Sequence, residues 1–355
     1  MKNQFFLFCS ILVFALGACS KKTESDPKPA RAGSSTKAER LSGFTYTKST
    51  PTGNWIGSSF VDQNNGYITG TGGAMIKTTD GGVNYTAVTG LPAVDLYGCF
   101  FITASNGFVV GNYNTTANSY TAYKTINNGA NWTALSLPAL PANVSFRSVY
   151  FYDSQMGFIG GGNGTILKTT NGGATWTLSN SGVGSSYALY SFLFFDKNIG
   201  LAAGSYGTMF RTTNGGMTWT PTVLHDSRAN LSSIAKTERD SVIVTTSIGG
   251  ALAGGELTTY LTSATKGVSW SKATLPGTYQ SLQSVKIFNE NNIYMVGGSV
   301  PNNTGVIFSK INFGPWTQET IPASGRLCTA AVYEYAPGDG VLFAAGLSNS
   351  VIKGQ

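Results

Sequence analysis

One turn-like phrase recurs along the chain, and its spacing restricts the architectures that the chain can adopt. In each copy a hydroxyl residue is followed seven positions later by an aromatic residue, as in "TTNGGATW", residues 169–176. The six pairs are Thr78/Tyr85, Thr125/Trp132, Thr169/Trp176, Thr212/Trp219, Ser263/Trp270 and Ser309/Trp316. Successive copies begin 43–51 residues apart, a period typical of architectures that repeat one small sheet.

Each copy has the residues of a hairpin turn between two strands. An acid or amide two places after the hydroxyl can accept backbone N–H groups, and a glycine two places later can adopt a positive φ. The acid or amide is Asp80, Asn127, Asn171 or Asn214, and the glycine is Gly82, Gly129, Gly173 or Gly216. Burying the aromatic residue removes about 150–250 Å² from water, so the motif has a sufficient structural role without catalysis.

The last two copies, which end at Trp270 and Trp316, are degenerate. Thr265 and Ile311 replace the acid or amide, and Phe313 replaces the glycine of the sixth copy. We therefore expect less regular turns in these two places.

Phrases such as "FVDQNNGYITG", before the first copy, predict two further strands per repeat. Four strands in each repeat predict an all-β fold, a seven-bladed β-propeller of four-stranded blades. The count of seven comes from the first strands, which share a small residue where strands crowd around the axis: Gly57, Gly98, Ser148, Ser191, Ser232, Ser284 and Thr329. The chain ends after a third strand, so we expect "FTYTKS", residues 44–49, to complete the last blade and close the ring.

The N-terminal residues predict export. Residues 1–18 have the layout of a signal peptide, with Lys2 before a short apolar run. "LGAC", residues 16–19, resembles the lipobox of bacterial lipoproteins, which implies a lipid on Cys19; the alternative is ordinary cleavage near Ala18. We expect residues 19–41 to be a flexible tether and residues 42–355 to be the propeller. Lys21 and Lys22 follow Cys19 without an acidic cluster, which favours an outer-membrane anchor facing the periplasm.

Charge and cysteine usage exclude several classes of protein. The formal charge is +7, but residues 42–355 carry 16 basic and 13 acidic side chains, so no nucleic-acid role is predicted. Cys99 and Cys328 fall on blades two and seven, which are not neighbours, so we expect both to be free thiols. We predict no metal, no cofactor and a monomer; His225 is the sole histidine.

The turn motif resembles the Asp box, also called the BNR repeat. Together with the signal, "FxDxxxG" and the sevenfold count, it resembles the photosystem II assembly and stability factor family of Asp-box propellers, over roughly residues 44–355. That resemblance implies a non-catalytic protein that binds a protein partner or assists assembly in the cell envelope. An arginine patch is associated with the family's role, but no residue here aligns with it.

The start of the first strands is the predicted binding surface, at one mouth of the channel. The candidate residues are Trp55, Tyr97, Arg147, Tyr190, Arg228, Gln283 and Arg326. Two long links, residues 112–120 and 247–258, are expected on the same face, where loops carry function. The alternative is that the aromatic residues merely plug the channel. The cations before the boxes, Lys77, Lys124, Lys168 and Arg211, are expected on a solvated face or in an anionic-partner patch.

A glycan-directed function is the alternative class. Sialidases also carry Asp boxes, and Arg147, Arg228 and Arg326 all fall near one mouth with Asp95 close by. A xyloglucanase-like glycosidase would need a second propeller to form its cleft. A pair of facing carboxylates at the mouth would favour a glycosidase, whereas a mouth with Arg, Tyr and Gln favours a binding protein.

Overall fold

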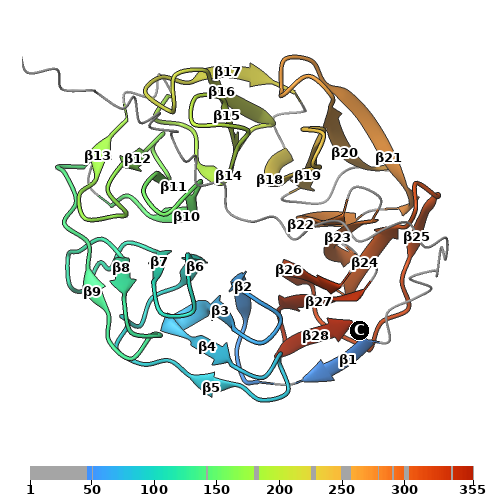
Figure 1. Cartoon of the computed structure of the whole chain (residues 1–355), viewed down its shortest axis with the longest axis horizontal. Helices are drawn as coiled ribbons and strands as arrows, with labels where there is room; N and C mark the ends of the chain where they lie inside the picture. The colour runs from blue at the N-terminus through green and yellow to red at the C-terminus, as the bar shows by residue number, and fades with distance from the viewer. Residues whose placement is uncertain are drawn as a thin grey trace, which may run out of the picture. The chain divides into compact units, whose positions relative to one another are not determined.

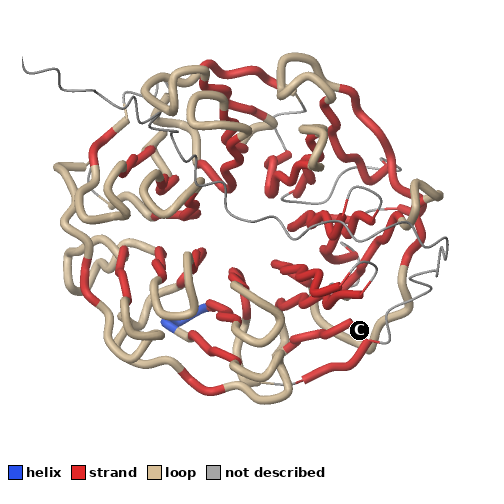
Figure 2. Tube along the Cα trace, in the orientation of Figure 1, coloured by secondary structure: helices blue, strands red, loops and turns tan. Residues whose placement is uncertain are grey.

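The computed structural model describes residues 46–49, 51–140, 143–179, 184–224, 229–248, 257–278, 280–289, 292–299, 304–336 and 339–354. These residues form seven antiparallel four-stranded sheets, the blades of a β-propeller (Figure 1). Within these ranges the only helical segment is the short turn η1 (Thr71–Gly73) (Figure 2). No helix in the described part of the chain is long and apolar enough to cross a membrane. The predicted seven-bladed fold is confirmed.

The blades follow one another along the chain. Blades one and two are β2 (Trp55–Phe60), β3 (Gly66–Gly70), β4 (Met75–Thr78), β5 (Thr86–Ala87), and β6 (Leu96–Phe101), β7 (Gly107–Gly111), β8 (Ala122–Thr125), β9 (Thr133–Ala134). Blades three and four are β10 (Phe146–Phe151), β11 (Gly157–Gly161), β12 (Ile166–Thr169), β13 (Thr177–Leu178), and β14 (Leu189–Phe194), β15 (Gly200–Gly204), β16 (Thr208–Thr212), β17 (Thr220–Val223). Blades five and six are β18 (Ala229–Lys236), β19 (Val242–Ile248), β20 (Leu257–Ser263), β21 (Ser271–Thr278), and β22 (Gln280–Asn289), β23 (Asn292–Ser299), β24 (Gly305–Lys310), β25 (Trp316–Gln318). Blade seven is β26 (Leu327–Ala336), β27 (Asp339–Gly346), β28 (Ser350–Gly354) and β1 (Tyr46–Ser49).

The N-terminal strand closes the ring, as predicted. β1 is the outer strand of blade seven and pairs antiparallel with β28, with Tyr46 opposite Gly354 and Ser49 opposite Val351. This pairing covers the edge of a strand whose Val351 and Ile352 are buried. An uncovered edge would be open to pairing with another chain. Phe44, which the sequence placed at the start of this strand, lies outside the described residues.

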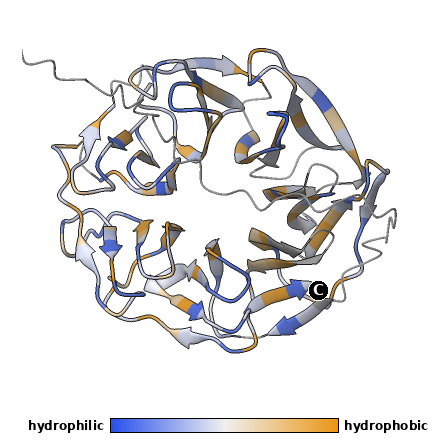
Figure 3. Ribbon diagram, in the orientation of Figure 1, coloured by the Kyte–Doolittle hydropathy of each residue, from blue (hydrophilic) through white to orange (hydrophobic). Residues whose placement is uncertain are grey.

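The core consists of layers between neighbouring blades, with apolar stretches along the middle strands (Figure 3). In the first four blades an aromatic ring at the end of the innermost strand stacks on one from the second strand of the preceding blade. The stacked pairs are Phe60/Phe343, Phe101/Tyr67, Phe151/Phe108 and Phe194/Phe158, with centroid distances of 4.1, 3.5, 4.5 and 4.6 Å. The box tryptophans Trp132, Trp176 and Trp219 pack edge-on against these layers.

The Asp-box turn is held by side-chain hydrogen bonds within the turn. In the third copy Thr169 Oγ1 accepts the backbone N–H of Gly173 at 2.9 Å, and Asn171 Oδ1 accepts that of Thr175 at 2.9 Å. Gly173 has φ of 76°, and a Cβ there would lie 2.5 Å from the ring of Phe108 in the preceding blade. The glycine is therefore required both by the turn and by the blade interface.

The fifth copy of the motif is more regular than the sequence indicated. Thr265 Oγ1 accepts the backbone N–H of Ser269 at 2.8 Å, and Ser263 Oγ accepts that of Gly267 at 3.0 Å. A threonine hydroxyl is an acceptor like an amide oxygen, so it can replace the missing Asn. The sixth copy does depart from the pattern, because Phe313 has φ of 60° and is exposed, while Ser309 hydrogen-bonds Glu319 instead.

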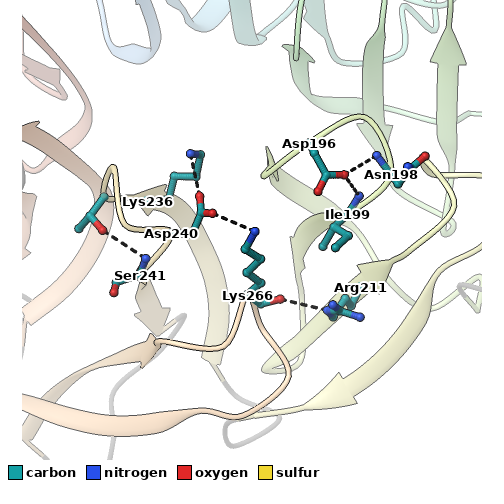
Figure 4. Close-up of polar contacts among 9 residues, drawn as sticks. Asp196, Asn198, Ile199, Arg211, Lys236, Asp240, Ser241 and Lys266 are labelled. Carbon is teal, nitrogen blue, oxygen red and sulfur yellow. Dashed lines mark hydrogen bonds and ion pairs between the residues drawn. The ribbon is translucent and has the colours of Figure 1, made fainter.

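The cations before the boxes connect neighbouring blades. Lys77 Nζ donates to the carbonyl oxygen of Asn128 at 2.9 Å, and Lys124 Nζ donates to that of Gly172 at 3.0 Å. Arg211 Nε likewise donates to the carbonyl oxygen of Lys266 at 3.0 Å (Figure 4). Each acceptor belongs to the box turn of the next blade. For these three residues the structure adds a role in the blade interfaces that the sequence did not indicate, and all three remain partly exposed.

We expect replacement of Thr169 by valine to weaken the protein, because the buried N–H of Gly173 loses its acceptor. An unsatisfied buried donor costs about 1–3 kcal/mol in the free energy of unfolding. Urea denaturation of Thr169→Val measures this loss. Thr170→Val is the matched control, because Thr170 is exposed. Equal stability of the two variants would contradict the role assigned to the hydroxyl.

Deletion of residues 44–49 should lower the melting temperature and cause self-association, because it exposes the edge of β28. Differential scanning fluorimetry and light scattering measure the two effects. A variant that lacks only residues 20–40, within the predicted tether, is the control and should behave as the full chain does. A truncated protein that melts unchanged and stays monomeric would show that β1 contributes nothing to closure.

Candidate functional site

Every innermost strand carries a β-bulge at the same place. The pairing register with the second strand skips one residue between an apolar residue and the small residue that follows, as between Phe146 and Ser148. The seven skipped residues are Ile56, Tyr97, Arg147, Tyr190, Ser232, Gln283 and Cys328. A bulge takes its extra residue out of the ladder and re-aims its side chain.

These seven residues, one from each blade, line a cavity of about 200 Å³ together with Asn230. We call this cavity the channel mouth. A second cavity of about 340 Å³ shares the same seven residues and extends past them to Phe100, Tyr150, Leu193 and Lys286. Among the residues that the structure describes, no carboxylate lines either cavity. The lining is therefore cationic, aromatic and polar.

Small residues after the bulges keep the innermost strands close together. A Cβ on Gly57 would lie 2.8 Å from the carbonyl oxygen of Tyr97 in the next blade, and Ser148 Oγ donates to the carbonyl oxygen of Leu189 at 3.2 Å. In blade five the predicted alignment is wrong by one residue: Ser233 is the small residue and Ser232 faces the channel. These contacts hold the channel mouth in a fixed frame.

The chemistry of the mouth centres on Arg147. Its guanidinium carbon lies 4.0 Å from the ring centroid of Tyr97, a cation–π arrangement that leaves the N–H groups at the edge of the guanidinium plane available. Burial raises the pKa of Tyr190, while the charge of Arg147 acts in the opposite direction. Burial also raises the pKa of Cys328 to about 11, so this thiol is protonated at neutral pH.

The structure brings together four of the seven predicted mouth residues: Tyr97, Arg147, Tyr190 and Gln283. Trp55 is not among them, because it precedes the bulge, points into the blade and is 1% exposed. Arg326 likewise precedes a bulge and packs against Gly298 outside both cavities. Arg228, like His225, lies outside the described residues.

Five residues of the site were not predicted from the sequence: Ile56, Ser232, Cys328, Asn230 and Lys286. The signal for the first three was the apolar–x–small pattern of the innermost strands, whose middle residue is the one that the bulge releases. Cys328 was considered only as a free thiol. Both it and Cys99 are indeed free. Lys286 follows Gln283 by three residues and lines the deeper cavity, where no sequence pattern indicated a function.

One of the two long links lies on the face predicted for it. The backbone N–H of Asn112 donates to the carbonyl oxygen of Asp95 at 2.8 Å, and that of Tyr113 donates to Ser145 Oγ at 3.2 Å. The link 112–120 therefore lies beside the starts of β6 and β10. Most of the link 247–258 lies outside the described residues. Within the described ranges no group of three or more His, Cys, Asp or Glu side chains is placed to hold a metal ion.

Comparison with known proteins agrees with the architecture. A family model described as Photosynthesis system II assembly factor YCF48 matches residues 124–254. None of the curated proteins matches the chain. The solved structure "YCF48 bound to D1 peptide" is 17% identical, with a TM-score of 0.64 over 88% of this chain and 94% of that one. YCF48 from Cyanidioschyzon merolae is 16% identical, with a TM-score of 0.60 over 87% of this chain and 98% of that one.

A glycoside hydrolase also shares the fold. The GH74 enzyme of Niastella koreensis is 17% identical, with a TM-score of 0.59 over 78% of this chain and 46% of the enzyme, so this chain spans about half of that enzyme's length. Likeness at this level of identity establishes the fold and not the activity. The chain is thus a seven-bladed β-propeller that resembles the YCF48 photosystem II assembly factors, in sequence over its central residues and in fold over most of its length.

Proposed function

We propose that this chain is a non-catalytic propeller, anchored in the bacterial envelope, that binds a protein partner at the channel mouth. The observation that carries the proposal is the ring of bulge residues, in which Arg147 stacks on Tyr97 beside Tyr190 and Gln283. Arg and Tyr are the residues that most often anchor protein recognition. A frame of close-packed strands holds these side chains in place, so that less side-chain entropy is lost when a partner binds.

A similar propeller supports a peptide as the ligand class. The structure titled "YCF48 bound to D1 peptide" shows that a propeller of this fold holds a peptide. The link 112–120 adds a second surface beside the mouth, where Tyr113 and Tyr120 pack edge-to-face at 5.3 Å. A partner that enters the mouth would contact this link as well.

The membrane anchor is the second part of the proposal. Its support is the lipobox-like "LGAC" ending at Cys19 and the polar residues after it. The lipid would hold the propeller at the outer membrane, facing the periplasm, so that the mouth meets membrane or periplasmic partners. Partition of a Cys19→Ala variant into membranes at the level of the unchanged chain would contradict this part.

A glycosidase is the less supported alternative. Such enzymes need two carboxyl groups on either side of the scissile bond, and the described residues that line the channel supply none. The likeness to the GH74 enzyme extends to less than half of that chain. We therefore propose binding and not hydrolysis.

The double substitution Arg147→Ala and Tyr190→Ala should abolish partner capture without unfolding the propeller. Both side chains face the channel mouth and neither pairs in the sheet ladder. Quantitative pull-down from detergent-solubilised membranes, compared protein by protein with the unchanged chain, measures capture. Circular dichroism and the melting temperature establish that the variant is folded.

Lys272→Ala is the matched control, because Lys272 is an exposed cation on β21, an outer strand. It should capture the same proteins as the unchanged chain. If the double variant retains those proteins, the binding surface lies elsewhere. The box cations Lys77 and Lys124 are unsuitable as controls, since their loss removes hydrogen bonds between blades.

A further inference from the structure

Among the residues that the structure describes, two cations face the channel interior without a countercharge. Arg147 lines the mouth, and Lys286 lines the deeper cavity among Phe100, Tyr150 and Leu193. Within the described residues, neither side chain forms a hydrogen bond or an ion pair; the contact of Arg147 is with the ring of Tyr97. Other lysines of the propeller, such as Lys124 and Lys266, have carbonyl or carboxylate partners.

The position of Lys286 is unfavourable for a charge. It is partly buried in the ring, and burial lowers the pKa of its ammonium group. Phe100 and Leu193, which line the same cavity from other blades, are apolar, and the hydroxyl of Tyr150 accepts the backbone N–H of Phe194 at 3.3 Å. A buried charge is costly unless it is paired. An anion in the channel would supply the missing partner. The attraction between the two charges would be stronger there than in bulk water, because the effective dielectric constant is lower inside the protein.

The two cations lie at different depths of the channel. They come from blades three and six, which are nearly opposite in a ring of seven. Lys286 follows the bulge residue Gln283 by three positions, so it lies about 10 Å deeper than the level of Arg147 at about 3.3 Å per residue. At the level of Arg147 the wall also carries the hydroxyls of Tyr97 and Tyr190.

We propose that the channel is an anion-binding site, in which Arg147 contacts a carboxylate or phosphate group at the mouth and Lys286 contacts one held deeper. This inference rests on the proposed function for its biological setting and names the chemistry that the mouth recognises. The shared chemistry is an oxyanion, which either a small diacid or an acidic peptide segment can present. A cavity of about 340 Å³ has the size of a small-ligand site.

Isothermal titration of the full chain in detergent tests the proposal. The probes are sodium succinate, inorganic phosphate and tetraglutamate, at constant ionic strength, with tetraglutamine as the uncharged control. At least one anionic probe should bind one to one, and tetraglutamine should not. Tightest binding of tetraglutamate identifies an acidic peptide as the ligand, whereas tightest binding of succinate or phosphate identifies a small free anion. Absence of binding by all three anions would overturn the site.

Three variants separate the site from a general charge effect. Lys286→Met and Arg147→Met should each weaken binding of the tightest-binding anionic probe at least about tenfold, the scale of one charge-assisted hydrogen bond. Lys286→Arg keeps the charge and should retain binding within a few-fold. Lys272→Met removes an exposed cation and should bind as the unchanged chain does. Unchanged binding by Lys286→Met and Arg147→Met would refute the assignment.

The stability of Lys286→Met gives a second measurement that does not depend on the probe. Removing an unpaired, partly buried charge should leave the ligand-free melting temperature equal or higher. A fall of several degrees would show that the ammonium group has a structural role instead and would count against the site. Anion binding can fail while Arg147→Ala with Tyr190→Ala still abolishes capture. That result would overturn the anion site and leave the protein-binding function standing. Anion binding by a chain that captures no protein partner would instead overturn the protein-binding function and leave the anion site.

Discussion

The ring depends on close contact between the turn glycine of the first five Asp boxes and the second strand of the preceding blade. At Gly173 and Gly216 the nearest atom to a built Cβ is an aromatic ring carbon of that strand, at 2.5 Å. Lys124, from the same preceding blade, donates to the carbonyl just before Gly173. One turn therefore contributes to a hairpin and to an interface. Each blade therefore depends on its neighbours for stability, and blade seven must be complete to contact blade one. The N-terminal strand β1 completes blade seven by pairing with β28.

The two faces of the propeller have different chemistry as a result. On the Asp-box face, several acids and cations bind one another or the backbone within turns and interfaces; Asp240, for example, accepts from both Lys236 and Lys266 (Figure 4). Burial acts to raise the pKa of Asp240, but the hydrogen bonds from these lysines outweigh it and lower the pKa. In the channel, Arg147 at the mouth and Lys286 in the deeper cavity have no such partners among the described residues. This contrast is the main reason for assigning recognition to the mouth.

Sequence periodicity was sufficient to predict the blades and the turn chemistry, because each recurs and depends on neighbours in the chain. The closure, a pairing of β1 with β28, followed from a last repeat that lacked its fourth strand. It was insufficient wherever a bulge changes the direction of a side chain. Trp55 and Arg326 were placed at the mouth, whereas the residue that follows each of them by one or two positions faces the channel. The role of Lys77 was missed because its acceptor, Asn128, lies 51 residues away in sequence. Long-range partners of this kind leave no local pattern.

The repeated bulge has a consequence for how propellers of this kind diversify. A residue that lies outside the hydrogen-bond ladder can be exchanged without altering the sheet, and each blade contributes one such residue to the channel. Ile56, Arg147 and Cys328 occupy equivalent places although they share no chemistry. The inner lining is thus a set of seven independent positions on an invariant frame. Two chains could keep every blade interface identical and still select ligands of opposite charge, which separates the evolution of specificity from that of the fold.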